Sequence, residues 1–598
     1  MQAIALRSLV LLTVSVHLAA QAPRALPQSL EAALPASTYA AVSFGGLARC
    51  HAAADALPLA AAVHAFLAKV PAEVRAERLD EHLEQATRHV QEALGQAGLR
   101  PADVRAFLGQ PMTLAIGRMS IEGMGPSVAL LVEIGDKKAA INRVVQWCAQ
   151  RLGELAGGAE GGEVAIGDAR FHSMTMNEGP VLFAGAIGRY YVASNSRGYL
   201  RDLVDVANGR TAGLGQSTRL VQLQGQLPAP ALAALFVNAD RVCSAFAPHL
   251  PYEAEQWSAA LGLGAVDALY AATTAGADGG SDLWHLGVGG SERGLLKALV
   301  AAPVDLAFAQ SCSANTVAFG AGSFDVGAFA GAFHRFAELL PAAARGEMME
   351  ELERGIGEAL AEFGSSPDEA HKLMAAFGTQ LGMALALEKG AVPKPEMLVR
   401  IAVRDPQVVA ALLQQLEGKV SEQSGLEWKT RKADDHEVRF VNLPLPEAKL
   451  QLSPCYVVTK DSLWLGSDAQ ALVRALRQDP AASLAAQPDF QALATQSKGA
   501  SGVMHLRLFR AAEIGWRTVE TMAYPQLDAH QDEVGFGSDA LPDSETMAKA
   551  LGTSSWVWTV DDAGVTVQSR GTFTFGSLLA AFGACGDEVL GRAGAKVY

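Results

Sequence analysis

Charged residues are scarce in this sequence: they make up 19% of its 598 residues, against roughly 25% in an average globular chain. Basic residues are the scarcer kind, with 48 Lys and Arg against 63 Asp and Glu, which gives a formal net charge of −15. Binding to nucleic-acid phosphates needs clustered Lys and Arg, and none of the short basic runs forms such a cluster. We therefore expect no nucleic-acid partner and no electrostatic docking on anionic lipid.

Cysteine and the known catalytic motifs are also rare or absent. The six cysteines lie far apart and form no CxxC pair, which excludes the usual redox and zinc motifs. The sequence contains no GxSxG elbow, SxxK, Walker loop or EF-hand loop, so the common hydrolase, nucleotide and calcium signatures are missing. We expect no cofactor, and no residue is identified as catalytic.

Long hydrophobic runs are confined to the N-terminus. Residues 1–22 combine Arg7, an apolar stretch from Leu9 to Ala20, and small residues at Ala20 and Ala22. This layout is typical of a secretory signal that is cleaved after residue 22. An uncleaved anchor is the alternative, but the apolar stretch is shorter than the roughly 20 residues that a membrane span requires. We expect an exported protein, periplasmic or extracellular, without a transmembrane span once the signal is removed.

One phrase occurs twice in the sequence. YYVASNSRGYLRDLV (190–204) and SLWLGSDAQALVRAL (462–476) both read as a short apolar strand, a polar break and a helix with Leu at a fixed place. Short polar side chains at such a break cap the first turn of a helix. The candidate caps are Asn195 or Ser196 in the first copy and Ser467 or Asp468 in the second.

The similarity extends over most of the chain. Matching strands with period-two alternation occur at 130–134 and 399–403, and the second is followed by Asp405-Pro406, which is typical of a helix start. Hairpins with Asp and Gly in their turns are predicted at 268–288 and 555–569. We predict a tandem duplication: residues 1–22 signal, 23–33 linker, 34–302 repeat 1, 303–585 repeat 2 and 586–598 C-terminal tail.

Hairpins mixed with long amphipathic helices indicate the α+β class. We expect two homologous domains, each a mainly antiparallel sheet with helices packed on one face, related by an approximate twofold. The alternating rhythm of a doubly wound parallel sheet is missing.

The densest acidic patch is the one metal candidate. It contains Asp528, His530, Asp532 and Glu533. Carboxylates could hold Ca²⁺, but their spacing matches no known calcium loop, and a solvated insertion between helices is the better interpretation.

With these patterns, the chain resembles large exported bacterial proteins of the planctomycete type. They share an opening like LPASTYAAVSF (34–44) and phrases like YYVASNSRGYLRDLV and LWLGSDAQALVRAL. The resemblance implies a tandem duplicated α+β protein and assigns no activity to any residue.

Three functions remain open. The first is a non-enzymatic envelope protein that binds a partner through paired domains. The second is a carrier of an apolar ligand or lipid, because a sheet wrapped by helices can enclose a pocket. The third is a hydrolase with an unfamiliar site, using residues such as His530 and Asp532.

Overall fold

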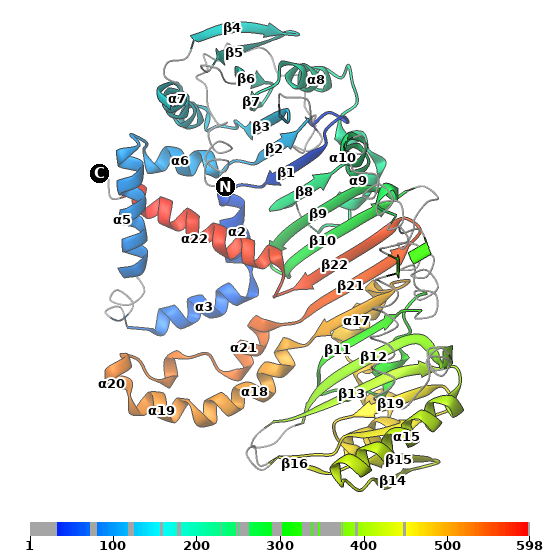
Figure 1. Ribbon diagram of the computed structural model, residues 1–598. Helices are drawn as coiled ribbons and strands as arrows, with labels where there is room; N and C mark the ends of the chain where they lie inside the picture. Colours follow the sequence, from blue (N-terminus) through cyan, green and yellow to red (C-terminus); the bar gives the residue numbers. More distant parts are fainter. Residues whose placement is uncertain are drawn as a thin grey trace. The chain divides into compact units, whose positions relative to one another are not determined.

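A computed structural model of the chain is shown in Figure 1. Apart from a few isolated residues between them, it describes residues 33–71, 81–117, 125–155, 160–175, 181–228, 230–246, 262–289, 302–325, 375–388, 393–445 and 450–595. The predicted signal lies outside these residues. Contacts divide the described residues into two compact units: unit 1 is drawn from Met1–Pro248, Asp267–Leu286 and Arg570–Tyr598, and unit 2 from His249–Val266 and Gly287–Ser569.

Unit 1 contains an antiparallel sheet whose strands pair in the order β4-β5-β6-β7-β3-β2-β1-β8-β9-β10. Its strands are β1 (Ala40–Phe44), β2 (Met112–Ile116), β3 (Val128–Glu133), β4 (Glu160–Ile166), β5 (Ala169–Thr175), β6 (Val181–Ile187), β7 (Tyr190–Ser194), β8 (Ala233–Val237), β9 (Val266–Gly276) and β10 (Gly279–Val288). Its helices are α2 (Leu47–Ala56), α3 (Pro58–Lys69), α5 (Glu81–Gln96), α6 (Pro101–Leu108), α7 (Lys138–Leu155), α8 (Arg197–Ala207), α9 (Thr218–Gln224), α10 (Ala239–Phe246) and α22 (Phe575–Ala595).

The C-terminal helix α22 belongs to unit 1. It packs against α2, α5 and α6, and its Ala580 shares a buried cluster with Cys50 of α2. Asp282 of β10 accepts hydrogen bonds from the backbone N–H groups of Phe575 and Gly576, at 2.9 Å each, and so caps the helix. The helix runs unbroken from Phe575 to Ala595.

Unit 2 contains a second antiparallel sheet, with strand order β14-β15-β18-β19-β13-β12-β11-β20-β21-β22. Its strands are β11 (Thr316–Ser323), β12 (Phe377–Glu388), β13 (Lys394–Val403), β14 (Lys429–Ala433), β15 (His436–Phe440), β18 (Cys455–Val458), β19 (Ser462–Gly466), β20 (Gly502–Leu506), β21 (Ser554–Asp561) and β22 (Gly564–Gly571), with the separate hairpin β16 (Leu443–Leu445) and β17 (Leu450–Leu452). Its helices are α15 (Pro406–Ser424), α16 (Ala469–Leu476), α17 (Pro488–Gln496), α18 (Leu508–Met522), α19 (Tyr524–Ala529), α20 (Gln531–Val534) and α21 (Ser544–Leu551).

Helices pack against parts of both faces of each sheet, which corrects the expected one-sided packing. Neighbouring residues of a strand point to opposite faces. In β19, Leu463 packs with Val409 of α15, whereas Trp464 packs with Leu472 of α16. In unit 1, Tyr191 of β7 likewise packs with α7, and the next residue, Val192, packs with α8. The prediction of a mixed α+β protein with antiparallel sheets is confirmed.

The predicted helix starts are also confirmed. Of the candidate caps, Ser196 accepts from the N–H of Tyr199, and Asp468 accepts from the N–H groups of Gln470 and Ala471. Asp405 caps α15 with Pro406 at its first turn. These caps lie where the local pattern placed them because capping depends on only three or four consecutive residues.

No single helix among the described residues is long and apolar enough to cross a membrane. In the described part of the chain, one pair of helices, α2 and α3, reaches the required length and composition when taken together, and the two are bent by 77° where they meet.

Candidate functional site

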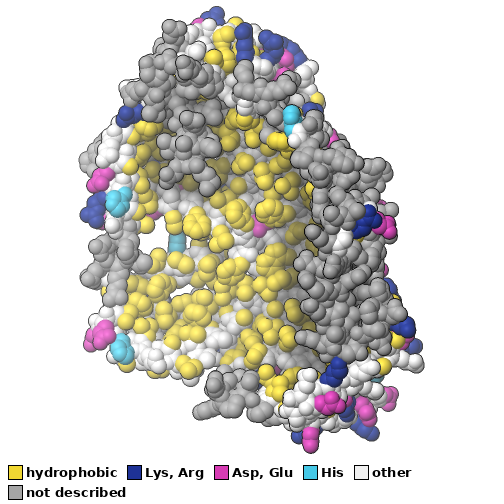
Figure 2. All heavy atoms as spheres, in the orientation of Figure 1, with side chains coloured by type: hydrophobic (Ala, Val, Ile, Leu, Met, Phe, Trp, Pro, Cys, Tyr) yellow, Lys and Arg dark blue, Asp and Glu magenta, His cyan; other side chains and the backbone are white. Residues whose placement is uncertain are grey.

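The sheet of unit 2 has an apolar face that no described helix covers over its middle strands. The exposed side chains are Leu381 (51%), Met383 (53%), Met397 (44%), Met504 (43%) and Leu385 (36%). Leu381, Met383 and Leu385 lie at alternate positions of β12, while Met397 lies in β13 and Met504 in β20. The alternate residues on the other face, such as Phe319, Ala384 and Val503, lie in the core. Figure 2 shows hydrophobic side chains gathered over a broad area of the face turned to the viewer.

The middle strand of this face, β11, carries almost no side chain. Its residues on the open face are Ala318, Gly320 and Gly322, since Gly320 pairs with Met383 on one side and with Met504 on the other. A Cβ placed on Gly320 would meet only one atom within 4 Å, the carbonyl oxygen of Val503 at 3.8 Å. None of the described side chains therefore fills the space above Gly320, and among these residues β11 forms the floor of a groove with walls on β12 and β20.

The groove is bordered by larger groups on both sides. Beyond β20, Trp556 of β21 pairs with Met504 and Trp558 pairs with Gly502. The ring of Trp558 lies directly over Gly502, because a Cβ there would come within 2.1 Å of it. Beyond β12 and β13, the same face of the sheet is covered by α15. Within the part of unit 2 that the structure describes, the uncovered strip therefore lies over the middle strands and ends at Gly322, where a Cβ would come within 3.4 Å of the Trp558 ring.

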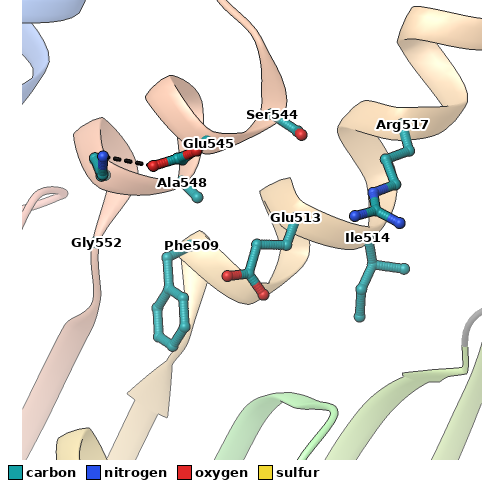
Figure 3. Close-up of a pocket in the computed structure, with 9 residues that line it drawn as sticks. Phe509, Glu513, Ile514, Arg517, Ser544, Glu545, Ala548 and Gly552 are labelled. Atoms are coloured by element: carbon teal, nitrogen blue, oxygen red, sulfur yellow. Dashed lines mark hydrogen bonds and ion pairs between the residues drawn. The ribbon is translucent and has the colours of Figure 1, made fainter.

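A cavity of about 790 Å³ lies between α18 and α21. α18 begins two residues after β20 ends, and α21 ends three residues before β21 begins. The cavity thus lies at the Leu506 end of these strands, the end at which Leu506 pairs with Ala318 of β11. Figure 3 shows one wall from α18, with Phe509, Glu513, Ile514 and Arg517, and the other from α21, with Ser544, Glu545, Ala548 and Gly552.

The charges that line this cavity are mostly paired. Lys549 forms an ion pair with Glu545 at 2.7 Å, drawn as a dashed line in Figure 3. Glu513 forms an ion pair with Arg510 on the same helix at 2.5 Å. Among the described residues, Arg517 forms no ion pair, but the lining contains two acidic side chains, Glu513 and Glu545, and two basic ones, so its formal charges balance.

A buried charged cluster lies in the core of unit 2, on the covered face. Asp489 of α17 accepts from Nε of Arg507 at 2.6 Å, and the Nε2 atom of His505 lies 3.1 Å from the same carboxylate oxygen. Burial would raise the pKa of Asp489, but the hydrogen bonds from His505 and Arg507 outweigh it and lower that pKa to about 2. Arg507 also donates to the carbonyl oxygens of Ala314 and Thr316. Because Nη1 of Arg507 donates to Ala314 and to Thr316, the first residue of β11, while Nε and Nη2 donate to Asp489, we interpret this cluster as a clamp that ties α17 to the floor of the groove.

The predicted acidic candidates do not converge on one point. Asp528 accepts from the N–H and the hydroxyl of Ser538. The Nδ1 atom of His530 lies 2.9 Å from the carbonyl oxygen of Gln526. Asp532 and Glu533 lie in the first turn of the short helix α20. Within the described residues, no group of three or more His, Cys, Asp or Glu side chains is placed to hold a metal ion.

The open face and the cavity were not predicted from the sequence. The segment TVAFGAGS (316–323) does place small residues at every second position, and LGMALAL (381–387) alternates Leu or Met with Ala or Gly. Their pairing places Gly320 and Gly322 of the first segment directly opposite Met383 and Leu381 of the second. Comparison of the chain with protein-family models, with curated proteins and with solved structures gave no match.

Proposed function

We propose that this chain is an exported, non-enzymatic binding protein that holds an apolar partner on the open face of the unit 2 sheet. The observation that carries this proposal is the uncovered strip of Leu381, Met383, Leu385, Met397 and Met504. Contiguous apolar surface is costly to expose to water and marks binding sites in proteins that keep it.

We also propose that the two units arose by duplication, as the repeated phrase suggests. The strand orders support this, because β1, β2, β3, β7, β8 and β9 of unit 1 follow the same pairing as β11, β12, β13, β19, β20 and β21 of unit 2. The units differ at the centre of the open face. In unit 1, Val42 of β1 pairs with Leu114 and Leu235, and its side chain stands where unit 2 has Gly320.

The test uses N-phenyl-1-naphthylamine, an uncharged dye that fluoresces in apolar sites. We expect the full chain to bind it and the double variant Met383→Lys/Met504→Lys to lose most of that fluorescence, because two ammonium groups would stand over the groove. Val420→Lys on α15 is the matched control, since Val420 is an exposed apolar residue of unit 2 outside the groove. If the double variant and the control bind the dye equally, the open face is not the binding surface.

A further inference from the structure

A second cavity, of about 230 Å³, lies on the covered face of the unit 2 sheet. Its floor includes Ala384 and Ala386 of β12 and Leu398 of β13. These residues alternate along their strands with the exposed side chains of the open face, so they point to the opposite face of the sheet. The walls come from α16 and from the segment that leads into β11. This cavity is therefore separate from the groove.

Unit 1 has a tyrosine side chain at the corresponding place. The hydroxyl oxygen of Tyr199 lies 2.8 Å from Oγ1 of Thr38. Its ring lies against Gly117, where an added Cβ would come within 2.3 Å of the ring. Tyr199 is only 3% exposed, so unit 1 fills this space with a phenol group of its own.

Ala471 of α16 is the counterpart of Tyr199 of α8. Each is the third residue after the cap of its helix, which is Ser196 in unit 1 and Asp468 in unit 2. The strand before each helix pairs with the corresponding strand, β7 with β3 and β19 with β13. Ala471 lines the cavity, so unit 2 has a methyl group where unit 1 has a phenol ring.

Thr316, which also lines the cavity, is the counterpart of Thr38. In both residues the backbone N–H donates to the carbonyl oxygen three residues earlier, at 3.0 Å. The hydroxyl of Thr316 donates to the carbonyl oxygen of Ser313 at 2.7 Å, which leaves its oxygen lone pairs to accept. A phenol O–H in the cavity can therefore donate to Thr316, at the place where the hydroxyl of Tyr199 meets Thr38.

The floor of the cavity differs from unit 1 at one residue, Ala386, which is the counterpart of Gly117. Each lies three residues after the partner of the central residue of the neighbouring strand. The methyl group of Ala386 would overlap a ring placed where the ring of Tyr199 lies, given the short distance at Gly117. A free ring is not tied to α16 and can lie above this methyl group. The volume of about 230 Å³ is sufficient, because a cavity of about 150 Å³ already holds benzene.

We propose that this cavity binds a small uncharged phenol, with its ring beside Ala471 and its hydroxyl at Thr316. Pockets for small molecules combine apolar walls with a few polar groups that fix the orientation of the ligand. The charged side chains of the lining are Glu388, Glu396 and Arg474, and Arg474 forms an ion pair with Glu396 at 2.6 Å. The lining thus has one carboxylate more than it has guanidinium groups, which disfavours an anionic ligand.

The experiment measures the dissociation constants of p-cresol and toluene for the full chain, by isothermal titration calorimetry. p-Cresol is the tyrosine side chain as a free molecule, and toluene has the same shape without the hydroxyl group. We expect p-cresol to bind. We expect Thr316→Val, which keeps the size of the side chain but removes the acceptor, to weaken p-cresol about fivefold and to leave toluene unchanged.

Two variants block the cavity. Ala386→Gly/Ala471→Tyr recreates the Tyr199 arrangement within unit 2, and its ring should weaken p-cresol at least about tenfold. Ala471→Leu fills the cavity without a ring and should have the same effect, which keeps the test valid if the double variant does not fold. The matched control is Ala386→Gly/Gln470→Tyr, because Gln470 is exposed on the same helix. This control should bind p-cresol as the unmodified chain does, and thermal midpoints show which variants are folded.

The other outcomes overturn the assignment. If folded blocking variants bind p-cresol as the unmodified chain does, the phenol binds elsewhere. Equal weakening of p-cresol and toluene in Thr316→Val would remove the hydroxyl contact from the proposal. 4-Hydroxybenzoate should bind at least about tenfold more weakly than p-cresol, and equal affinity would contradict the preference for an uncharged ligand. A full chain that binds no p-cresol up to the solubility limit would show a cavity that holds water only.

Discussion

The carboxylate of Asp489 accepts two hydrogen bonds from the guanidinium of Arg507, at 2.6 and 3.2 Å, and the side chain of Arg507 is almost completely buried. A buried arginine is tolerated only when its charge is matched and its N–H groups are satisfied. Asp489 provides the charge, and two carbonyl oxygens beside β11 accept the remaining hydrogen bonds. The pair therefore ties α17 and β20 to the start of the strand that forms the groove floor.

Replacing Asp489 should destabilise unit 2 strongly. Asp489→Asn keeps the size of the side chain but leaves the charge of Arg507 buried without a counter-charge, and we expect a loss of about 3 kcal/mol in the free energy of unfolding. Urea unfolding followed by tryptophan fluorescence measures this loss. The comparison variant is Glu545→Gln, which breaks an ion pair whose two side chains are each 76% exposed; it should cost less than about 1 kcal/mol. Equal effects of the two variants would contradict the clamp.

The carboxyl group of Asp489 should also make the free energy of unfolding decrease at acid pH. Its pKa in the folded protein is about 2, lower than the ordinary aspartate value of 3.8, so the folded state favours the ionised form. The resulting stability, on the order of 1–2 kcal/mol after solvent screening, is fully present above about pH 4 and is lost as the pH falls through about 2. Unfolding free energies measured between pH 5 and pH 2 should fall more steeply for the unmodified chain than for Asp489→Asn. Parallel curves would contradict the lowered pKa.

The contact between α22 and α2 should tolerate no added methyl group at Gly583. A Cβ on Gly583 would lie 2.3 Å from the Cβ of Cys50, which is fixed to the backbone of α2. We expect Gly583→Ala to cost about 1–3 kcal/mol and to increase hydrogen exchange in α22. Gly586→Ala on the same helix is the matched control, because its Cβ would meet only Leu47 at 3.8 Å. That variant should be neutral, or more stable by about 0.5–1 kcal/mol. A neutral Gly583→Ala would contradict the close packing.

The described thiols should separate into two classes. Cys50, Cys312 and Cys455 are buried, whereas Cys243 and Cys585 are exposed, and all five are free. Burial raises the pKa of Cys455 to about 12 and raises those of Cys50 and Cys312 as well. Alkylation requires an accessible thiolate, so iodoacetamide at pH 8 should modify only the two exposed thiols of these five until denaturant is added. Peptide mass spectrometry identifies the modified residues. Rapid modification of Cys312 in the native protein would contradict its burial.

Local features of this fold could be predicted from the sequence, and features that join distant segments could not. The caps at Ser196, Asp468 and Asp405 depend on a few consecutive residues. The groove depends on the register between β11 and β12, whose ends are separated by residues 324–376. A shift of one residue in this register would turn every side chain to the opposite face of the sheet. The small residues of β11 therefore could not, by themselves, predict which side chains lie beside them.

The docking of α22 was beyond sequence reasoning for the same reason. Its apolar and small residues suit a helix in either unit, and the repeat pattern assigned it to the second. The position of α22 is determined by the packing of Gly583 against Cys50 and by the cap from Asp282. Both contacts join residues that lie far apart in the chain. For the acidic patch, a solvated insertion between helices was the better interpretation from the start, because charge density along a sequence does not make carboxylates converge in space.

The assignment of α22 to unit 1 has a mechanical consequence. Both ends of the described chain, residues 33 and 595, belong to unit 1, while residues 302–325 and 375–569 belong to unit 2. A force that pulls the two ends apart is therefore carried by unit 1 alone, through β1 at one end and α22 at the other. Unit 2, with its groove, is inserted in the chain between segments of unit 1. It therefore bears no tension until unit 1 unfolds.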